Sequence, residues 1–219
     1  MRSDAVIFDM DGTLLNTLGD IMNSVNEVLE ADGYRPRGLE AFRRGVGWGL
    51  EHLVRSLLDP ASAERADIDR LCSRARLRYE RLVDSVTEPY PGVTEMLRTI
   101  QRGGVPISVL TNKPQRAAEL NAAEFFPRIV FHEVRGSLPG RPAKPDPDAA
   151  LSLARRMGAS PGRTLLVGDS EVDILTARNA GMPSAGVEWG FRGRSELEAA
   201  GADFILDTPA AVSELVLVG

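Results

Sequence analysis

Two aspartates follow the first apolar run of the chain. Asp9 and Asp11 flank one methionine and precede Gly12, directly after the apolar residues 5–8. A run with no polar residue on either face is typical of a strand buried on both sides, as in a parallel sheet. Residues two apart in extended chain point the same way, so both carboxylates can address one point beyond the strand. Carboxylates this close repel each other, and a bound cation or a shared proton is therefore expected.

The same residues also fit a purely structural interpretation. Aspartate and glycine are the commonest turn residues, so Asp9, Asp11 and Gly12 could simply form a turn after the strand. The pair alone does not decide between a turn and a metal site. The rest of the chain has to decide.

Three further segments offer polar groups in the same kind of place. Predicted strands over residues 105–110 and 164–167 each end in polar residues, and residues 136–147 predict a loop rich in Gly, Pro and basic residues. If the strands are parallel, these groups lie at one edge of the sheet, where open α/β sheets bind their ligands. The groups are Thr111 with Asn112, Lys144, and Asp169 with Asp173.

This set of side chains has a consistent chemical meaning. Carboxylates without histidine or cysteine nearby form the hard-oxygen environment that Mg²⁺ prefers. A hydroxyl, an amide and an ammonium group suit the oxygens of a phosphoryl group. One further carboxylate can attack phosphorus, because aspartate is a known covalent acceptor of phosphoryl groups. The set therefore predicts Mg²⁺-dependent phosphoryl chemistry.

The elements that must position these groups fall into two parts. Strands alternate with helices in residues 1–16 and 88–219, which predicts an α/β fold with a doubly wound parallel sheet. Residues 17–87 show helical spacing and no convincing strand, which predicts an inserted all-α unit. Within these parts we expect a long helix from about residue 63 to 83 and a short strand at residues 129–131.

Composition narrows the range of partners. The chain has 219 residues, 43% of them hydrophobic, and a net charge of -5, so we expect no nucleic acid and no membrane as partner. The single cysteine, Cys72, excludes an intrachain disulfide. Arginines at 74, 76, 78 and 81 share their helical stretch with Asp67, Asp69, Glu80 and Asp84, which is typical of a solvated helix face. Without a signal-like leader or a spanning segment, we expect a cytoplasmic protein, either a monomer or a homodimer.

The motifs DMDGT, TNK, AKPDP and GDSEVD occur in this order. Together they resemble the four motifs of the haloacid dehalogenase superfamily of aspartyl-phosphate phosphohydrolases. The resemblance covers essentially the whole chain, and it places the helical insertion where that family has a C1-type cap. It implies a Rossmann-like core, a small phosphorylated substrate and Mg²⁺ as cofactor.

The resemblance also implies roles for the acids. Asp9 would be the nucleophile, with one oxygen on the metal. Asp11 would protonate the leaving oxygen and then activate water, with its main-chain carbonyl on the metal. Asp169 would bind the metal, and Asp173 would support the coordination shell.

For the phosphoryl group, the resemblance implies three residues. Thr111 and Asn112 would hold the phosphoryl group during transfer. Lys144 would neutralise its charge and orient Asp9.

Within the family, the sequence favours phosphomonoester hydrolysis. The dehalogenases lack the second acid, here Asp11. The sugar-phosphate mutases carry a histidine that is absent from residues 16–20, and a phosphonatase needs a cap lysine, whereas no lysine precedes Lys113. The alternatives are a β-phosphoglucomutase-like enzyme and a phosphatase for another small sugar or nucleoside monophosphate.

Substrate choice is expected in the cap. Arg43 and Arg44 adjoin the glycine-rich loop 45–49, which contains Trp48. This loop and the dipeptide at residues 189–190 resemble those of phosphoglycolate phosphatases, so an arginine here could bind the carboxylate of 2-phosphoglycolate. Arginine pairs are also common on solvated helix faces, and Trp48 could equally anchor the cap core.

Overall fold

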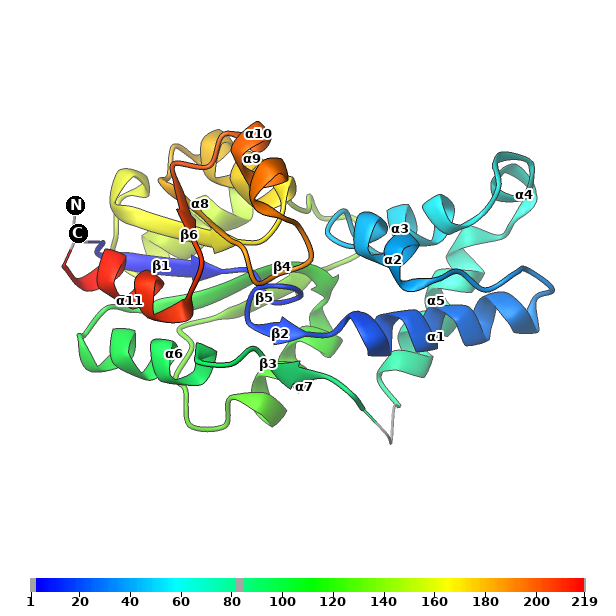
Figure 1. Ribbon diagram of the computed structural model, residues 1–219, viewed down its shortest axis with the longest axis horizontal. Helices are drawn as coiled ribbons and strands as arrows, with labels where there is room; N and C mark the ends of the chain where they lie inside the picture. The colour runs from blue at the N-terminus through cyan, green and yellow to red at the C-terminus, as the bar shows by residue number, and fades with distance from the viewer. Residues whose placement is uncertain (1–2, 82–84, 219) are drawn as a thin grey trace.

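A six-stranded parallel sheet forms the larger part of the molecule (Figure 1). The computed structural model describes residues 3–81 and 85–218. The strand order is β5-β4-β1-β6-β7-β8, and every neighbouring pair is parallel. The predicted doubly wound parallel sheet is therefore confirmed. The strands are β1 (Ala5–Phe8), β4 (Ile107–Pro114), β5 (Val134–Ser137), β6 (Thr164–Gly168), β7 (Ser184–Val187) and β8 (Phe204–Leu206).

Helices cover both faces of this sheet, because the side chains of β1 are apolar on both faces. Val6 and Phe8 pack in one hydrophobic cluster, and Ile7 packs in another on the opposite face. The first cluster includes residues of α6 (Val93–Arg102), α7 (Gln115–Phe125) and α11 (Pro209–Leu217). The second includes residues of α8 (Asp148–Arg156) and α9 (Glu171–Ala180), while η1 (Pro161–Arg163) and α10 (Arg194–Ala200) complete the connections.

The order of the strands reverses at β1. Phe8 lies opposite Val109 of β4 on one side and opposite Val167 of β6 on the other. A crevice opens beyond the carboxyl ends of the strands at such a switch point, and this crevice is where doubly wound sheets bind ligands. The residues that follow β1, β4 and β6 are thereby brought together.

The second part of the molecule is a group of helices between β2 and β3. These helices bury a hydrophobic cluster of their own, to which the sheet-bearing part contributes Phe191. Figure 1 shows them set apart from the sheet. The division into residues 17–87 and residues 1–16 with 88–219 stays a prediction. The helices are α1 (Leu18–Ala31), α2 (Leu39–Gly45), α3 (Leu50–Leu57), α4 (Pro60–Arg65) and α5 (Ile68–Tyr79).

Two local predictions were wrong. No strand forms at residues 129–131, because Phe131 packs edge-on against Phe126 and Val130 is exposed. The strand of this region is β5, which begins at Val134. The edge strand β5 reads Val-Arg-Gly-Ser, and so hydrophobicity does not reveal it. The long helix expected over residues 63–83 is broken into α4 and α5, and residues 82–83 lie outside the described part.

The two chain crossings between the parts form a short antiparallel pair. β2 (Leu15–Asn16) pairs with β3 (Glu88–Pro89). Buried Asp20, in the first turn of α1, accepts hydrogen bonds from the backbone N–H groups of Val86 and Thr87 at 2.9 and 3.1 Å and from the Thr87 hydroxyl at 2.6 Å. Asp20 therefore ties the start of the helical unit to its end.

We expect Asp20→Asn to lower the free energy of unfolding by about 1–3 kcal/mol at pH 7, because buried donors lose a charged acceptor. Burial acts to raise the pKa of Asp20, but the hydrogen bonds from Ser85 and Thr87 outweigh it and lower this pKa. The stabilisation is thus present above pH 4 and is lost as the pH falls through the lowered pKa. Urea unfolding should show a difference from wild type that narrows at pH 3. Asp69→Asn, at an exposed position of α5, should change little; an equal effect of both variants would contradict the account.

Candidate active site

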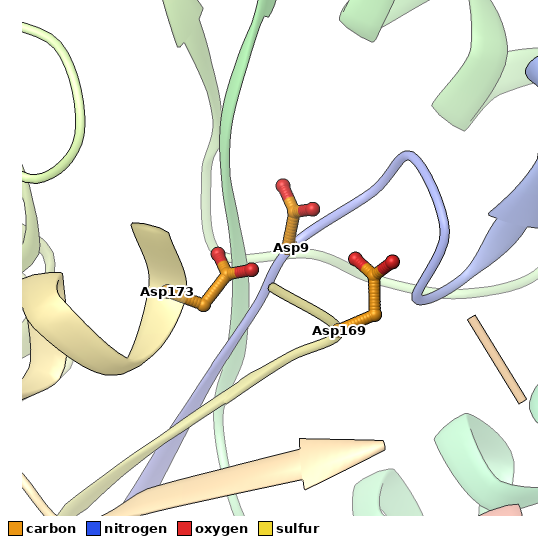
Figure 2. Close-up of side chains that lie close together, drawn as sticks. All are labelled: Asp9, Asp169 and Asp173. Atoms are coloured by element: carbon orange, nitrogen blue, oxygen red, sulfur yellow. The ribbon is translucent and has the colours of Figure 1, made fainter. Parts of the chain in front are cut away.

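Three carboxylates converge at the switch point (Figure 2). Asp9 follows β1, Asp169 follows β6, and Asp173 lies in the first turn of α9. One oxygen from each lies within 4.8 Å of the others, and all three side chains are buried. Three carboxylates with no nitrogen or sulfur donor in the cluster fit a hard divalent cation such as Mg²⁺.

Glycines make this close approach possible. Gly12 has φ of +89°, and a Cβ atom there would lie 2.3 Å from Oδ2 of Asp169. A Cβ atom at Gly168 would lie 2.1 Å from Cγ of Asp173. Both positions exclude any side chain, since real Cβ contacts are never this short. The glycines of the DMDGT and GDSEVD motifs thus serve packing against the acids.

Burial and mutual repulsion destabilise the charged form of these acids. Burial raises the pKa of Asp9 to about 7, with a further increase from Asp173, although Lys144 opposes it. Burial, Asp173 and Asp9 raise the pKa of Asp169 well above its usual value. A cation bound among the three oxygens would favour their ionised forms. The electrostatics of the cluster therefore match a metal site.

Lys144 supplies positive charge to the cluster. Its Nζ donates to Oδ1 of Asp9 at 2.7 Å and to Oδ1 of Asp173 at 2.6 Å. Burial alone would lower the pKa of Lys144, but Asp173 and Asp9 outweigh it and raise this pKa. Oδ2 of Asp173 accepts from the Ser170 hydroxyl at 2.7 Å, within the capping box of α9. Asp173 thus fixes Lys144 to the start of α9.

Asp11 is held through one oxygen. Its Oδ1 accepts from the Thr17 hydroxyl at 2.7 Å and from Lys113 Nζ at 2.9 Å. Lys113 Nζ also lies 4.1 Å from the centre of the Tyr79 ring on α5. In the described part of the chain, Oδ2 of Asp11 has no hydrogen-bond donor. This arrangement leaves one oxygen of Asp11 for proton transfer.

The end of β4 carries Thr111 and Asn112, both buried. Asn112 donates to the main-chain oxygens of Gly47 and Lys144 at 2.8 and 2.9 Å, and its Oδ1 accepts from the Lys144 N–H at 2.9 Å. Its side-chain amide therefore links the end of β4 to the Lys144 loop and to the helical unit. Thr111 lines the cavity beside Asp9 and Asp11. The predicted contacts of Thr111 and Asn112 with a phosphoryl group stay predictions.

A cavity that is partly open to solvent lies between the sheet edge and the helical unit. Asp9 and Asp11 border it on the sheet side, and apolar residues of α1 and α3 border it on the other. From α5 it receives Arg76 and Tyr79. Polar groups at one end and apolar side chains at the other are typical of small-molecule sites.

The predicted cap residues lie elsewhere. Arg43 and Arg44 are exposed and do not line this cavity; their main-chain oxygens accept hydrogen bonds from Arg192 instead. The Trp48 ring packs against His52, with the ring centres 6.1 Å apart, and it does not line the cavity either. The predicted substrate contacts of Arg43, Arg44 and Trp48 stay predictions.

The structure adds Lys113, Phe191 and Arg192 to the site that the motifs predict. The sequence gives one indication that Lys113 belongs to the site, because Lys113 and Lys144 are the only lysines among 26 basic residues. The sequence gives no such indication for Phe191 and Arg192. The Phe191 N–H donates to Oδ2 of Asp169 at 2.7 Å, and the buried Arg192 side chain binds the end of α2. Both residues lie in the loop between β7 and α10, which contacts the sheet-bearing part and the helical unit only once the chain has folded.

A family model for haloacid dehalogenase-like hydrolases matches residues 3–181. The chain belongs to this family. A phosphoglycolate phosphatase of Rhodobacter capsulatus is 40% identical over 192 residues, which cover 86% of this chain and 85% of that protein. An N-acetylmuramic acid 6-phosphate phosphatase of Pseudomonas aeruginosa is 32% identical over 224 residues, covering 99% and 96%.

One solved structure resembles the whole chain. It is a crystal structure from Lactobacillus delbrueckii subsp. bulgaricus, of a protein proposed to be a phosphoglycolate phosphatase. The TM-score is 0.92 at 30% identity, and the match covers 100% of both chains. The family's fold therefore extends over the sheet and the helical unit alike.

Proposed function

We propose that this chain hydrolyses phosphate monoesters with Mg²⁺ through a phospho-aspartate on Asp9. The proposed substrate is a small phosphorylated metabolite, with 2-phosphoglycolate as the first candidate. The observation that carries the proposal is the hydrogen bond from Lys144 to Asp9 in a cluster with the acids Asp169 and Asp173, with Asp11 two residues along the chain. That the enzyme is a phosphatase is supported by the family and by its phosphatase relatives.

In the first step, an oxygen of Asp9 attacks phosphorus and the ester P–O bond breaks. Lys144, which is hydrogen-bonded to Asp9, neutralises charge on the phosphoryl oxygens, and Thr111 lines the same cavity as Asp9. Oδ2 of Asp11 gives its proton to the leaving oxygen. Asp9, Asp169 and Asp173 would hold the metal, with the main-chain carbonyl of Asp11. Mg²⁺ would supply electrostatic stabilisation of the phosphoryl group.

In the second step, Asp11 takes a proton from a water molecule that attacks the phosphorus. The bond between phosphorus and the Asp9 oxygen breaks, which releases inorganic phosphate and restores the carboxylate. Thr17 and Lys113 hold the other oxygen of Asp11 in both steps, so that the acid keeps its orientation.

The choice of substrate rests on relatives and on the cavity. The relatives are named for 2-phosphoglycolate and N-acetylmuramic acid 6-phosphate, and both compounds are carboxylic acids. The cavity places apolar side chains of α1 and α3 opposite the acids, which suits a small organic leaving group. No helix in the described ranges is both long and apolar enough to cross a bilayer. A cytoplasmic location is part of the proposal, together with a monomeric or homodimeric state.

Phosphate release from p-nitrophenyl phosphate and from 2-phosphoglycolate tests this function. We expect turnover of both with Mg²⁺, loss of turnover with EDTA, and recovery when Mg²⁺ is restored. Absence of phosphate release from any monoester in the presence of Mg²⁺ would overturn the proposal. Isomerisation of a hexose phosphate faster than phosphate release would favour the mutase instead.

A further inference from the structure

The arginines of α5 are not equivalent. Arg70 lies 2.5 Å from Asp32, Arg74 also pairs with Asp32, and Arg78 lies 2.5 Å from Glu27. These three arginines follow the four-residue spacing of one helix face. Arg76 lies two residues from Arg74, about 200° around the helix, and it lines the cavity. The solvated helix face predicted from the sequence therefore does not include Arg76.

Arg76 is a cation without a carboxylate partner. Over residues 3–81 and 85–218, it makes no ion pair within 4.0 Å and no side-chain hydrogen bond. The two lysines near the cavity are already committed, Lys113 to Asp11 and Lys144 to Asp9 and Asp173. Arg76 is half-buried and lines the cavity, so its side chain adds an unpaired positive charge to the cavity wall.

A second polar group of the same cavity is also unsatisfied. Ser24 of α1 is 1% exposed and lines the cavity, and its hydroxyl has no hydrogen-bond partner among the described residues. Buried hydroxyls nearly always have a partner, so this one calls for an explanation. Otherwise α1 and α3 line the cavity with apolar side chains, namely Ile21, Val25, Leu50 and Leu53.

We propose that Arg76, with Ser24 of the same cavity, binds a carboxylate on the leaving group of the substrate. The proposal rests on the proposed function and deepens it, since Asp9 and Lys144 would take the phosphoryl end. A planar carboxylate matches one guanidinium in a bidentate pair and can accept one more hydrogen bond. A second phosphoryl group has three strong acceptor oxygens and up to two charges, more than Arg76 and Ser24 can satisfy. The enzyme thus selects phosphate esters of hydroxy acids over those of neutral alcohols.

The test compares 2-phosphoglycolate with ethyl phosphate, which has the same carbon count but no carboxylate. In wild type, kcat/KM is higher for 2-phosphoglycolate. Arg76→Met lowers kcat/KM for 2-phosphoglycolate by roughly 10- to 100-fold, mainly through KM, because one charged partner of the carboxylate is lost. Its kcat/KM for ethyl phosphate stays within about twofold, since no contact to that substrate is lost. Arg76→Lys retains part of the preference, because the charge remains without the planar fork.

Arg65→Met is the matched control, because Arg65, at the end of α4, is exposed and lies outside the cavity lining. It should leave the preference for 2-phosphoglycolate intact. Equal losses on both substrates in Arg76→Met, or loss of the preference in Arg65→Met alone, would overturn the inference. Wild type that hydrolyses neither ester nor p-nitrophenyl phosphate would instead refute the proposed function. The two failures are therefore distinguishable.

Discussion

Replacing Asp9 by asparagine is expected to lower kcat for every phosphate monoester by a factor on the order of 10⁴ or more, the scale seen when a covalent nucleophile is removed. An amide at this position cannot form the phospho-enzyme, whereas Lys144 and the remaining acids stay in place. The measurement is steady-state phosphate release from p-nitrophenyl phosphate with Mg²⁺. Residual activity near that of wild type would contradict the assignment of Asp9 as nucleophile.

Stability provides the control for Asp9→Asn. Because the pKa of Asp9 is raised to about 7, the folded protein binds a proton there more tightly than the unfolded chain does. Ionised Asp9 therefore costs stability: the cost is absent below pH 4, grows with pH, and is complete above pH 7. Without metal at pH 8, the variant should unfold at a temperature equal to or higher than that of wild type. A large decrease would mean that lost activity reflects misfolding.

Replacing Lys144 by methionine is expected to affect both activity and stability. kcat should fall by about 10²–10³, as when one charged or polar donor to a transition state is removed. The free energy of unfolding without metal should fall by about 3–5 kcal/mol, because Asp9 and Asp173 lose their buried partner. Both ion pairs involve a side chain that is only 3% exposed. Kinetics and urea unfolding measure the two effects separately.

Mg²⁺ and a conservative variant sharpen this test. Binding of Mg²⁺ to the folded protein should restore part of the stability lost in Lys144→Met, since it neutralises the same carboxylates. Lys144→Arg keeps the charge, so it should retain more stability than Lys144→Met while still losing activity, because the guanidinium cannot reproduce a compact ammonium between two acids. Wild-type stability in Lys144→Met without metal would contradict the proposed role of Lys144 in neutralising the cluster.

The sheet could be predicted because its central strands are buried on both faces. Residues 5–8 and 165–167 are continuous apolar runs that end at Asp9 and Gly168, and the structure places them side by side in β1 and β6. The edge strand β5 was misplaced because its half-buried residues carry no hydrophobic signal. The pair β2–β3 was missed for a different reason: each strand has only two residues, and their pairing depends on chain segments more than seventy positions apart.

The acids of the site could be predicted because Asp9 and Asp169 directly follow strands that the sequence reveals, and Asp173 lies in the first turn of the next helix. The helical side of the site was harder. A surface arginine and a cavity arginine have the same local sequence context, and only the orientation of α5 against α1 separates Arg76 from Arg74. Likewise, Arg43 and Arg44 adjoin a glycine-rich loop, as an active-site arginine would. In the folded chain, however, it is their main-chain oxygens that accept hydrogen bonds, and the donor is Arg192.

The central claim is that phosphate passes through a covalent bond to Asp9. Borohydride reduces an acyl phosphate to an alcohol, so reduction during turnover of p-nitrophenyl phosphate with Mg²⁺, followed by peptide mass spectrometry, tests the claim directly. We predict homoserine at position 9 in the peptide containing the DMDGT motif, and no such product without substrate or in Asp9→Asn. Turnover without modification of Asp9, or homoserine at position 11 or 169 instead, would contradict the account.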